Sequence, residues 1–247
     1  MTTIHNLCVA HRGASGLAPE NTMAAFQKAM SFPFVQWMEL DVQLSRDGVP
    51  VVIHDASLNR TTSGAGPVAD FRTTQLSRLD AGSWFSKSFG GERVPLLEQV
   101  LDATIGRCRL NIELKTYNGI YPGMERKVVE LLERKGLQHD SVITSFDHQA
   151  LRTVRELSAE VRTGLITDLA PASLASDLQQ LGASFLSIGF KRITPELMKE
   201  MRSRGIDVMA WTVNDTATMR RLAAIDPNLM ICTNYPDRFA QLLQDGI

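Results

Sequence analysis

The feature of this sequence that most limits its fold is an eightfold alternation of short apolar runs and amphipathic segments. Apolar runs of strand length occur at Leu7–Ala10, Trp37–Val42, Arg109–Leu114, Ser141–Ser145, Arg162–Ile166, Ser184–Ile188, Asp207–Val213 and Leu229–Cys232. Segments with apolar residues three or four apart, typical of helices with one buried face, occur at 22–31, 95–105, 124–135, 147–157, 172–181, 195–204, 216–224 and 237–244. Eight such units in 247 residues predict an α/β protein, a (β/α)8 TIM barrel in which residues 1–247 form a single domain.

Signals at the ends of the predicted helices support this division of the chain. Thr194-Pro195 precedes one helix and Asp215 precedes the next, while Gly136 and Gly182 follow two others. The alternative architecture is a doubly wound sheet. The sequence lacks the glycine-rich dinucleotide-binding turn that would favour it.

One region departs from the alternation and predicts a hairpin. After Trp37–Val42 the chain turns at 45–48 and returns as Pro50–Asp55, a link too short for a parallel crossover. The hairpin would bring His54 close to Asp41.

The polar, glycine-rich segment of about 56–93 that follows predicts a small insertion after the second strand. A loop in this position lies over the C-terminal mouth of a barrel, where active sites are built. Trp84 and Phe85 within it could form a wall of a substrate pocket. The alternative is that they pack inside the insertion.

Composition excludes several classes of partner. A formal net charge of −1 gives no broad field for nucleic acid or acidic membranes, so we expect neither as a partner. No run of 18 apolar residues and no signal peptide are present, which predicts no stable membrane association. Cys8, Cys108 and Cys232 are odd in number and lie in apolar runs, which favours free thiols and a cytoplasmic location.

Charged side chains directly follow four short apolar stretches, LCVA, VQWM, VVI and LNI. They are His11-Arg12, Glu39 with Asp41, His54-Asp55, and Glu113 with Lys115. Burying unpaired charge costs several kcal/mol or more, so we expect these groups to converge on one site.

The spacing of the acids indicates a metal site. Glu39 and Asp41 are two residues apart on a predicted strand, so their carboxylates share a face, and Glu113 lies in a similar position. Convergent carboxylates suit hard cations such as Mg²⁺ or Ca²⁺. The alternative is a network of salt bridges with Arg12 and Lys115.

The histidines suggest the chemistry that such a site could perform. Singly, His11 and His54 are each better explained as packed or capping residues, but together beside a carboxylate site they can take and give protons. Arg12 adds a fork for an oxyanion. These groups together suit the cleavage of a phosphate ester.

Longer motifs make the interpretation specific. They are HRGASGLAPENT (His11–Thr22), ELDVQLSRDGVPVVIHD (Glu39–Asp55), NRTTSGAG (Asn59–Gly66), IELK (Ile112–Lys115), SF (Ser145-Phe146) and AWTVN (Ala210–Asn214). In this order and at these spacings they closely resemble the glycerophosphodiester phosphodiesterase family, above all its compact cytosolic bacterial members. The resemblance extends over nearly the whole chain.

The resemblance implies roles for individual residues. Glu39, Asp41 and Glu113 match the family's ligands for a divalent metal, usually Mg²⁺ or Ca²⁺. His11 and His54 match its acid and base, although the sequence does not say which is which.

Three further residues match substrate-binding positions of the family. Arg12 and Lys115 match cations that contact phosphate, and Trp211 matches an aromatic near the glycerol pocket, although barrel packing would equally explain a tryptophan there. The chain departs from the family at Asn234, where many members have aspartate, so a hydrogen-bonding role for an acid at this position is in doubt.

The resemblance therefore implies hydrolysis of glycerophosphodiesters, such as glycerophosphocholine or glycerophosphoethanolamine, to sn-glycerol 3-phosphate and an alcohol. Attack by the substrate's own hydroxyl through a cyclic phosphate is a variant of this mechanism. Two alternatives are a metal-dependent lyase or isomerase on the same barrel and a barrel that only binds glycerophosphate. The sequence predicts neither the headgroup preference nor the oligomeric state.

Overall fold

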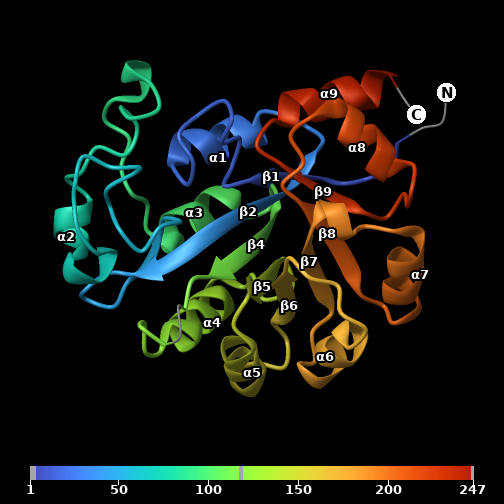
Figure 1. Ribbon diagram of the computed structural model, residues 1–247. Helices are drawn as coiled ribbons and strands as arrows, with labels where there is room; N and C mark the ends of the chain where they lie inside the picture. Colours follow the sequence, from blue (N-terminus) through green and yellow to red (C-terminus); the bar gives the residue numbers. More distant parts are fainter. Residues whose placement is uncertain (1–3, 117–118, 246–247) are drawn as a thin grey trace.

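The computed structural model describes residues 4–116 and 119–245, and these residues form a closed barrel of parallel strands (Figure 1). The barrel strands are β1 (Cys8–His11), β2 (Val35–Leu44), β4 (Arg109–Leu114), β5 (Ser141–Ser145), β6 (Arg162–Thr167), β7 (Phe185–Gly189), β8 (Asp207–Trp211) and β9 (Met230–Thr233). Strand β1 pairs in parallel with β2 on one side and with β9 on the other, which closes the barrel. The predicted (β/α)8 fold is confirmed, although β8 ends at Trp211 rather than at the predicted Val213.

At least one helix follows each barrel strand, and the helices outside the insertion together surround the barrel (Figure 1). They are α1 (Met23–Met30), α3 (Leu97–Thr104), α4 (Met124–Lys135), α5 (His148–Leu157), α6 (Leu174–Gln180), α7 (Pro195–Ser203), α8 (Thr216–Ala223) and α9 (Pro236–Asp245). The side chains of Thr194 and Asp215 accept hydrogen bonds from the first turns of α7 and α8, as the sequence predicts. Each of these described helices is too short or too polar to cross a lipid bilayer.

Alternation along β2 divides the core into two layers. Met38, Leu40 and Val42 belong to the large cluster between the barrel and its helices, which also contains fully buried Phe26 of α1. Trp37 faces the barrel interior, where it contacts Phe185 with 6.4 Å between ring centroids. Burying one large apolar side chain stabilises the fold by about 1.5–3 kcal/mol, so both layers hold the strands in place.

The predicted hairpin is confirmed. Strand β3 (Pro50–Val52) runs antiparallel to the end of β2, with Val42 opposite Val52. The backbone N–H of Ile53 donates to the carbonyl of Asp41 at 3.0 Å, which brings His54 back to the mouth of the barrel.

The insertion forms a small unit beside the mouth, on the left in Figure 1. It contains η1 (Val68–Asp70), α2 (Thr73–Leu76) and η2 (Lys87–Phe89), and it has a core of its own that includes Leu58, Val68 and Leu76.

Trp84 and Phe85 do not take the position at the pocket that the sequence suggested. Trp84 is 41% and Phe85 36% exposed, and the two rings contact each other edge to face at 5.7 Å. Phe85 also contacts Phe89. These aromatics pack within the insertion, which agrees with the alternative interpretation.

Candidate active site

The loop after β1 has an unusual backbone that aims two side chains into the mouth. Arg12 and Asn21 both have φ of 56°, in the left-handed region that few residues other than glycine adopt. The N–H of Asn21 donates to the carbonyl of Arg12 at 3.1 Å. Between them, Gly13 has φ of 76°, and a Cβ there would approach the backbone of Ala25 within 2.6 Å. The loop is therefore packed tightly against α1.

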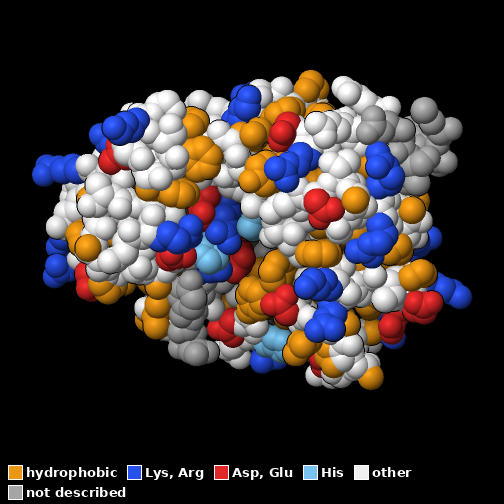
Figure 2. Space-filling model, turned by 45° about the horizontal axis from the view of Figure 1, so that its top comes forward, with side chains coloured by type: hydrophobic (Ala, Val, Ile, Leu, Met, Phe, Trp, Pro, Cys, Tyr) orange, Lys and Arg blue, Asp and Glu red, His pale blue; other side chains and the backbone are white. Residues whose placement is uncertain are grey.

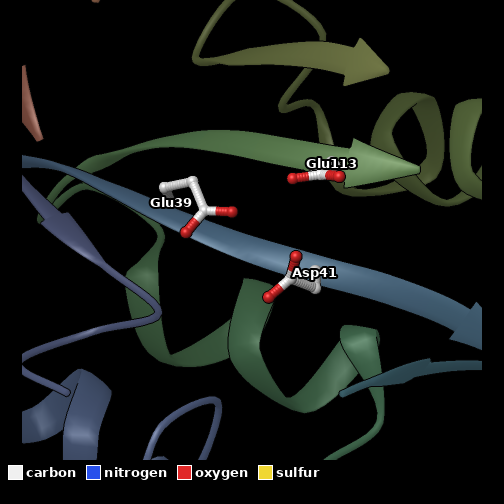
Figure 3. Close-up of side chains that lie close together, drawn as sticks. All are labelled: Glu39, Asp41 and Glu113. Atoms are coloured by element: carbon white, nitrogen blue, oxygen red, sulfur yellow. The ribbon is translucent and has the colours of Figure 1, made fainter. Parts of the chain in front are cut away.

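Three carboxylates converge at the mouth. Glu39 and Asp41 extend from the interior face of β2, and Glu113 extends from β4, where it lies opposite Asp41 in the strand register (Figure 3). One oxygen from each lies within 4.8 Å of the others. Glu39 and Asp41 are buried, at 4% and 0% exposure.

Two cations partly balance these acids. Arg12 Nε lies 3.2 Å from Asp41 Oδ2, while Lys115 Nζ lies 2.8 Å from Glu113 Oε1 and 3.6 Å from Asp41 Oδ1. The backbone N–H of Arg12 also donates to Glu39 Oε2 at 3.0 Å. The ion pairs of the alternative interpretation are therefore present, but three carboxylates face two cations.

The excess of negative charge helps to raise the pKa of two of the three acids. Burial and the neighbouring Asp41 raise the pKa of Glu113 to about 7, and the same two causes hold the pKa of Glu39 well above its usual value. Burial alone would raise the pKa of Asp41, but Arg12 and Lys115 outweigh it and lower that pKa. The site therefore favours an additional positive charge.

His11 stands on one side of the carboxylates. Its Nδ1 lies 2.7 Å from Asn234 Oδ1, and its Nε2 lies 3.7 Å from Glu39 Oε2. Burial, with Arg12 next to it, lowers the pKa of His11 to about 4. At this position, where many family members have aspartate, the chain therefore bonds His11 with a neutral amide.

His54 stands on the other side with a different set of partners. Its Nδ1 lies 2.7 Å from Asp55 Oδ1, and its Nε2 lies 3.2 Å from Lys115 Nζ. A lysine ammonium can only donate, so Nε2 accepts in this contact and the ring proton resides on Nδ1, where it is donated to Asp55. The lone pair of His54 Nε2 therefore points toward the site.

A cavity of about 160 Å³ opens between the two histidines. Figure 2 shows a hollow on this face where basic, acidic and histidine side chains meet. The rings of Trp211 and Phe146 meet edge to face at 6.1 Å on its wall. Its lining consists of His11, Arg12, Glu39, His54, Asn111, Glu113, Lys115, Phe146, Ile166, Ser187, Met209, Trp211, Thr212 and Cys232.

The structure brings the residues singled out in the sequence to this one place. Of the eight candidates, only Asp41 does not line the cavity, because it lies buried beneath Arg12 and Lys115. Sequence reasoning gave no role to Arg60 or Phe146, although both lie in motifs that it used. It also gave none to Asn111, whose polar side chain inside an apolar strand was an available signal.

The fold and these groups define a (β/α)8-barrel enzyme whose mouth brings together histidines, which are able to transfer protons, and cations, which are able to bind an anion. Residues 11–238 match the model of the glycerophosphoryl diester phosphodiesterase family. The chain belongs to this family.

Individual relatives agree with this assignment. The chain is 35% identical to a glycerophosphodiester phosphodiesterase of Caldanaerobacter subterraneus, over 97% of this chain and 98% of the relative. A phosphodiesterase of Oleispira antarctica, solved in complex with its product sn-glycerol-3-phosphate, superposes with a TM-score of 0.89 at 30% identity, covering 97% of both chains. A glycerophosphodiester phosphodiesterase of Agrobacterium tumefaciens gives 0.83 at 33% identity, covering 96% of this chain and 99% of that one. These matches favour phosphodiester hydrolysis over the lyase, isomerase and binding-only alternatives.

Proposed function

We propose that this protein hydrolyses glycerophosphodiesters, among them glycerophosphocholine and glycerophosphoethanolamine, to sn-glycerol 3-phosphate and an alcohol. The observation that carries the proposal is the placement of His11 and His54 on opposite sides of a carboxylate cluster, around a cavity lined by Arg12 and Lys115. Family membership and the product named in the Oleispira antarctica complex support the same substrate class.

The carboxylates Glu39, Asp41 and Glu113 fit a divalent cation, for which we propose Mg²⁺ or Ca²⁺. Their donors are all oxygen, as these ions prefer. Among the described residues, Asp41 Oδ1 is a buried oxygen without a hydrogen-bond donor, and the raised pKa values of Glu39 and Glu113 reflect uncompensated charge. When bound, such an ion would withdraw charge from the phosphate oxygens.

The remaining side chains supply binding and proton transfer. Arg12 and Lys115 would contact the phosphate, and His11 and His54 would act as the acid and base, each holding its Nε2 toward the cavity. In the part of the chain that the structure describes, Trp211 Nε1 has no hydrogen-bond acceptor, so a glycerol hydroxyl could accept from it. This proposal gives Trp211 a polar role in addition to its packing against Phe146.

Two finer expectations from the sequence belong to the same proposal. Cys8, Cys108 and Cys232 are free, which supports a cytoplasmic location. The partner is then a small diester, with neither nucleic acid nor a membrane required. The single-domain organisation of residues 1–247 stays a prediction.

Release of sn-glycerol 3-phosphate from glycerophosphocholine tests the proposal. We expect release with Mg²⁺ or Ca²⁺, loss of release with EDTA, and recovery when the metal is restored. The protein with Glu156→Gln, an exposed acid on α5, serves as the control and should behave like the wild type. A preparation that releases no sn-glycerol 3-phosphate from any glycerophosphodiester with either metal would contradict the proposed activity.

A further inference from the structure

Arg60, in the insertion, contacts two acids that belong to different parts of the site. Its Nε and Nη2 donate to the two oxygens of Asp55 at 2.7 and 3.0 Å. Its Nη1 and Nη2 donate to the two oxygens of Glu20 at 2.7 and 2.8 Å. One guanidinium thus binds both carboxylates in the bidentate geometry that arginine favours.

Each of these acids holds one of the groups at the cavity. Asp55 Oδ1 accepts from His54 Nδ1 at 2.7 Å, and Glu20 Oε1 accepts from Arg12 Nη1 at 2.9 Å. The contacts form a continuous chain from His54 through Asp55, Arg60 and Glu20 to Arg12. Neither Asp55 nor Glu20 lines the main cavity, so neither is placed to contact the substrate.

We propose that Arg60 is a positioning residue that fixes the ring of His54 and the guanidinium of Arg12 at the same time. This inference rests on the proposed function for its kinetic consequences. Arg60 itself is absent from the cavity lining and acts only through Asp55 and Glu20. The insertion therefore contributes to catalysis by holding His54 and Arg12 in fixed positions relative to each other.

The pKa values of Asp55 and Glu20 support this positioning role of Arg60. Hydrogen bonds from Arg60 are the main cause that lowers the pKa of Asp55, so this acid stays ionised and ready to accept the proton of His54 Nδ1. Burial alone would raise the pKa of Glu20, but hydrogen bonds from Arg60 and the charge of Arg12 lower it. Without Arg60, Asp55 and Glu20 would face each other as two acids with no cation between them.

Separate measurements of kcat and KM test the inference. Arg60→Gln should lower kcat about tenfold to a hundredfold, because a small misplacement of a reacting group has about that effect, and it should raise KM several-fold through Arg12. Arg60→Lys keeps the charge but cannot bind both carboxylates bidentately, so its kcat and KM should lie between those of the wild type and those of Arg60→Gln. The matched control is Arg78→Gln, an exposed arginine of the same insertion, which should leave kcat and KM unchanged.

Double-mutant cycles separate positioning from a structural role. In an Asp55→Ala background, Arg60→Gln should no longer lower kcat by more than about twofold, because the link to His54 is already cut. In a Glu20→Ala background, the effect on KM should be lost instead. The inference is overturned if Arg60→Gln changes kcat and KM equally in both backgrounds. It is also overturned if the kcat and KM of Arg60→Gln are the same as those of Arg78→Gln.

A spectroscopic readout keeps the inference testable without turnover. In long-range ¹H–¹⁵N spectra of the wild type, the His54 ring should show one tautomer with the proton on Nδ1, and Arg60→Gln should give a mixture of tautomers. Added guanidinium ion should restore the single tautomer, because Arg60 is 43% exposed and leaves an accessible gap. An unchanged His54 spectrum in Arg60→Gln overturns the inference, whereas an inactive wild type with the expected spectra contradicts only the proposed function.

Discussion

Replacing Glu113 by glutamine should make the metal-free protein more stable at alkaline pH, even though it removes a group that we propose as a metal ligand. The pKa of Glu113 rises from 4.5 in the unfolded chain to about 7 in the folded protein. Each pKa unit is worth about 1.4 kcal/mol, so ionised Glu113 destabilises the fold by about 3 kcal/mol above pH 7. Because the folded-state value is the higher one, full stability is present below about pH 4.5 and is lost as the pH rises through about 7.

Equilibrium urea unfolding in EDTA, followed by tryptophan fluorescence, measures this effect. At pH 8 we expect the free energy of unfolding of Glu113→Gln to exceed that of the wild type by about 3 kcal/mol, and at pH 5 by less than about 1 kcal/mol. Glu156→Gln is the matched control, since Glu156 is exposed on α5, and it should show no such dependence on pH.

Adding metal should reverse the order of stability. At a thousand times its Kd, Mg²⁺ or Ca²⁺ should stabilise the wild type by about 4.1 kcal/mol, which exceeds the advantage of about 3 kcal/mol that the variant has in EDTA, and it should stabilise the variant much less. If Glu113→Gln is less stable than the wild type at pH 8 in EDTA, or if the difference is the same at pH 5, then Glu113 does not carry the unbalanced charge that we assign to it.

Three further predictions address the other side chains. His11→Ala and His54→Ala should each lower kcat by roughly 10²- to 10⁴-fold with the fold intact by circular dichroism; a loss within about threefold would show that the pair is misassigned. Asn234→Asp should raise the pKa of His11 from its value of about 4, because a carboxylate in place of the amide favours the charged ring, and an NMR titration of the metal-free protein that finds no rise would contradict this. Phe26→Ala, at a fully buried ring of α1, should lower the free energy of unfolding by about 3–5 kcal/mol, and a loss below about 1 kcal/mol would show that Phe26 is not an essential part of the core.

The sequence predicts the fold and most of the candidate site because both depend on local patterns. The amphipathic spacing of 124–135 matches the bounds of α4, and the turn at 45–48 is enough to predict the hairpin. The candidate residues lie in the C-terminal parts of apolar strands or shortly after them, and the carboxyl ends of parallel strands meet at one mouth. Their convergence therefore follows once the strands are recognised.

Other features depend on contacts that no local pattern encodes. Asn234 meets His11 across 223 residues, and Arg60 meets Glu20 across 40 residues only because the insertion folds back on the β1 loop. The glycine-rich insertion has no helical or strand periodicity, so the sequence could not place Trp84.

The left-handed backbone at Arg12 and Asn21 has a consequence for laboratory evolution. Left-handed geometry costs an L-residue roughly 1–2 kcal/mol relative to the common conformations, a cost that glycine avoids. Glycine at either position would relieve this strain but would remove the guanidinium or the amide that holds Asp41, and breaking a buried ion pair costs more, about 3–5 kcal/mol. In this loop, a screen for heat tolerance and a screen for turnover would therefore both retain Arg12 and Asn21 despite the strained backbone, so libraries that vary the loop should keep these two positions fixed.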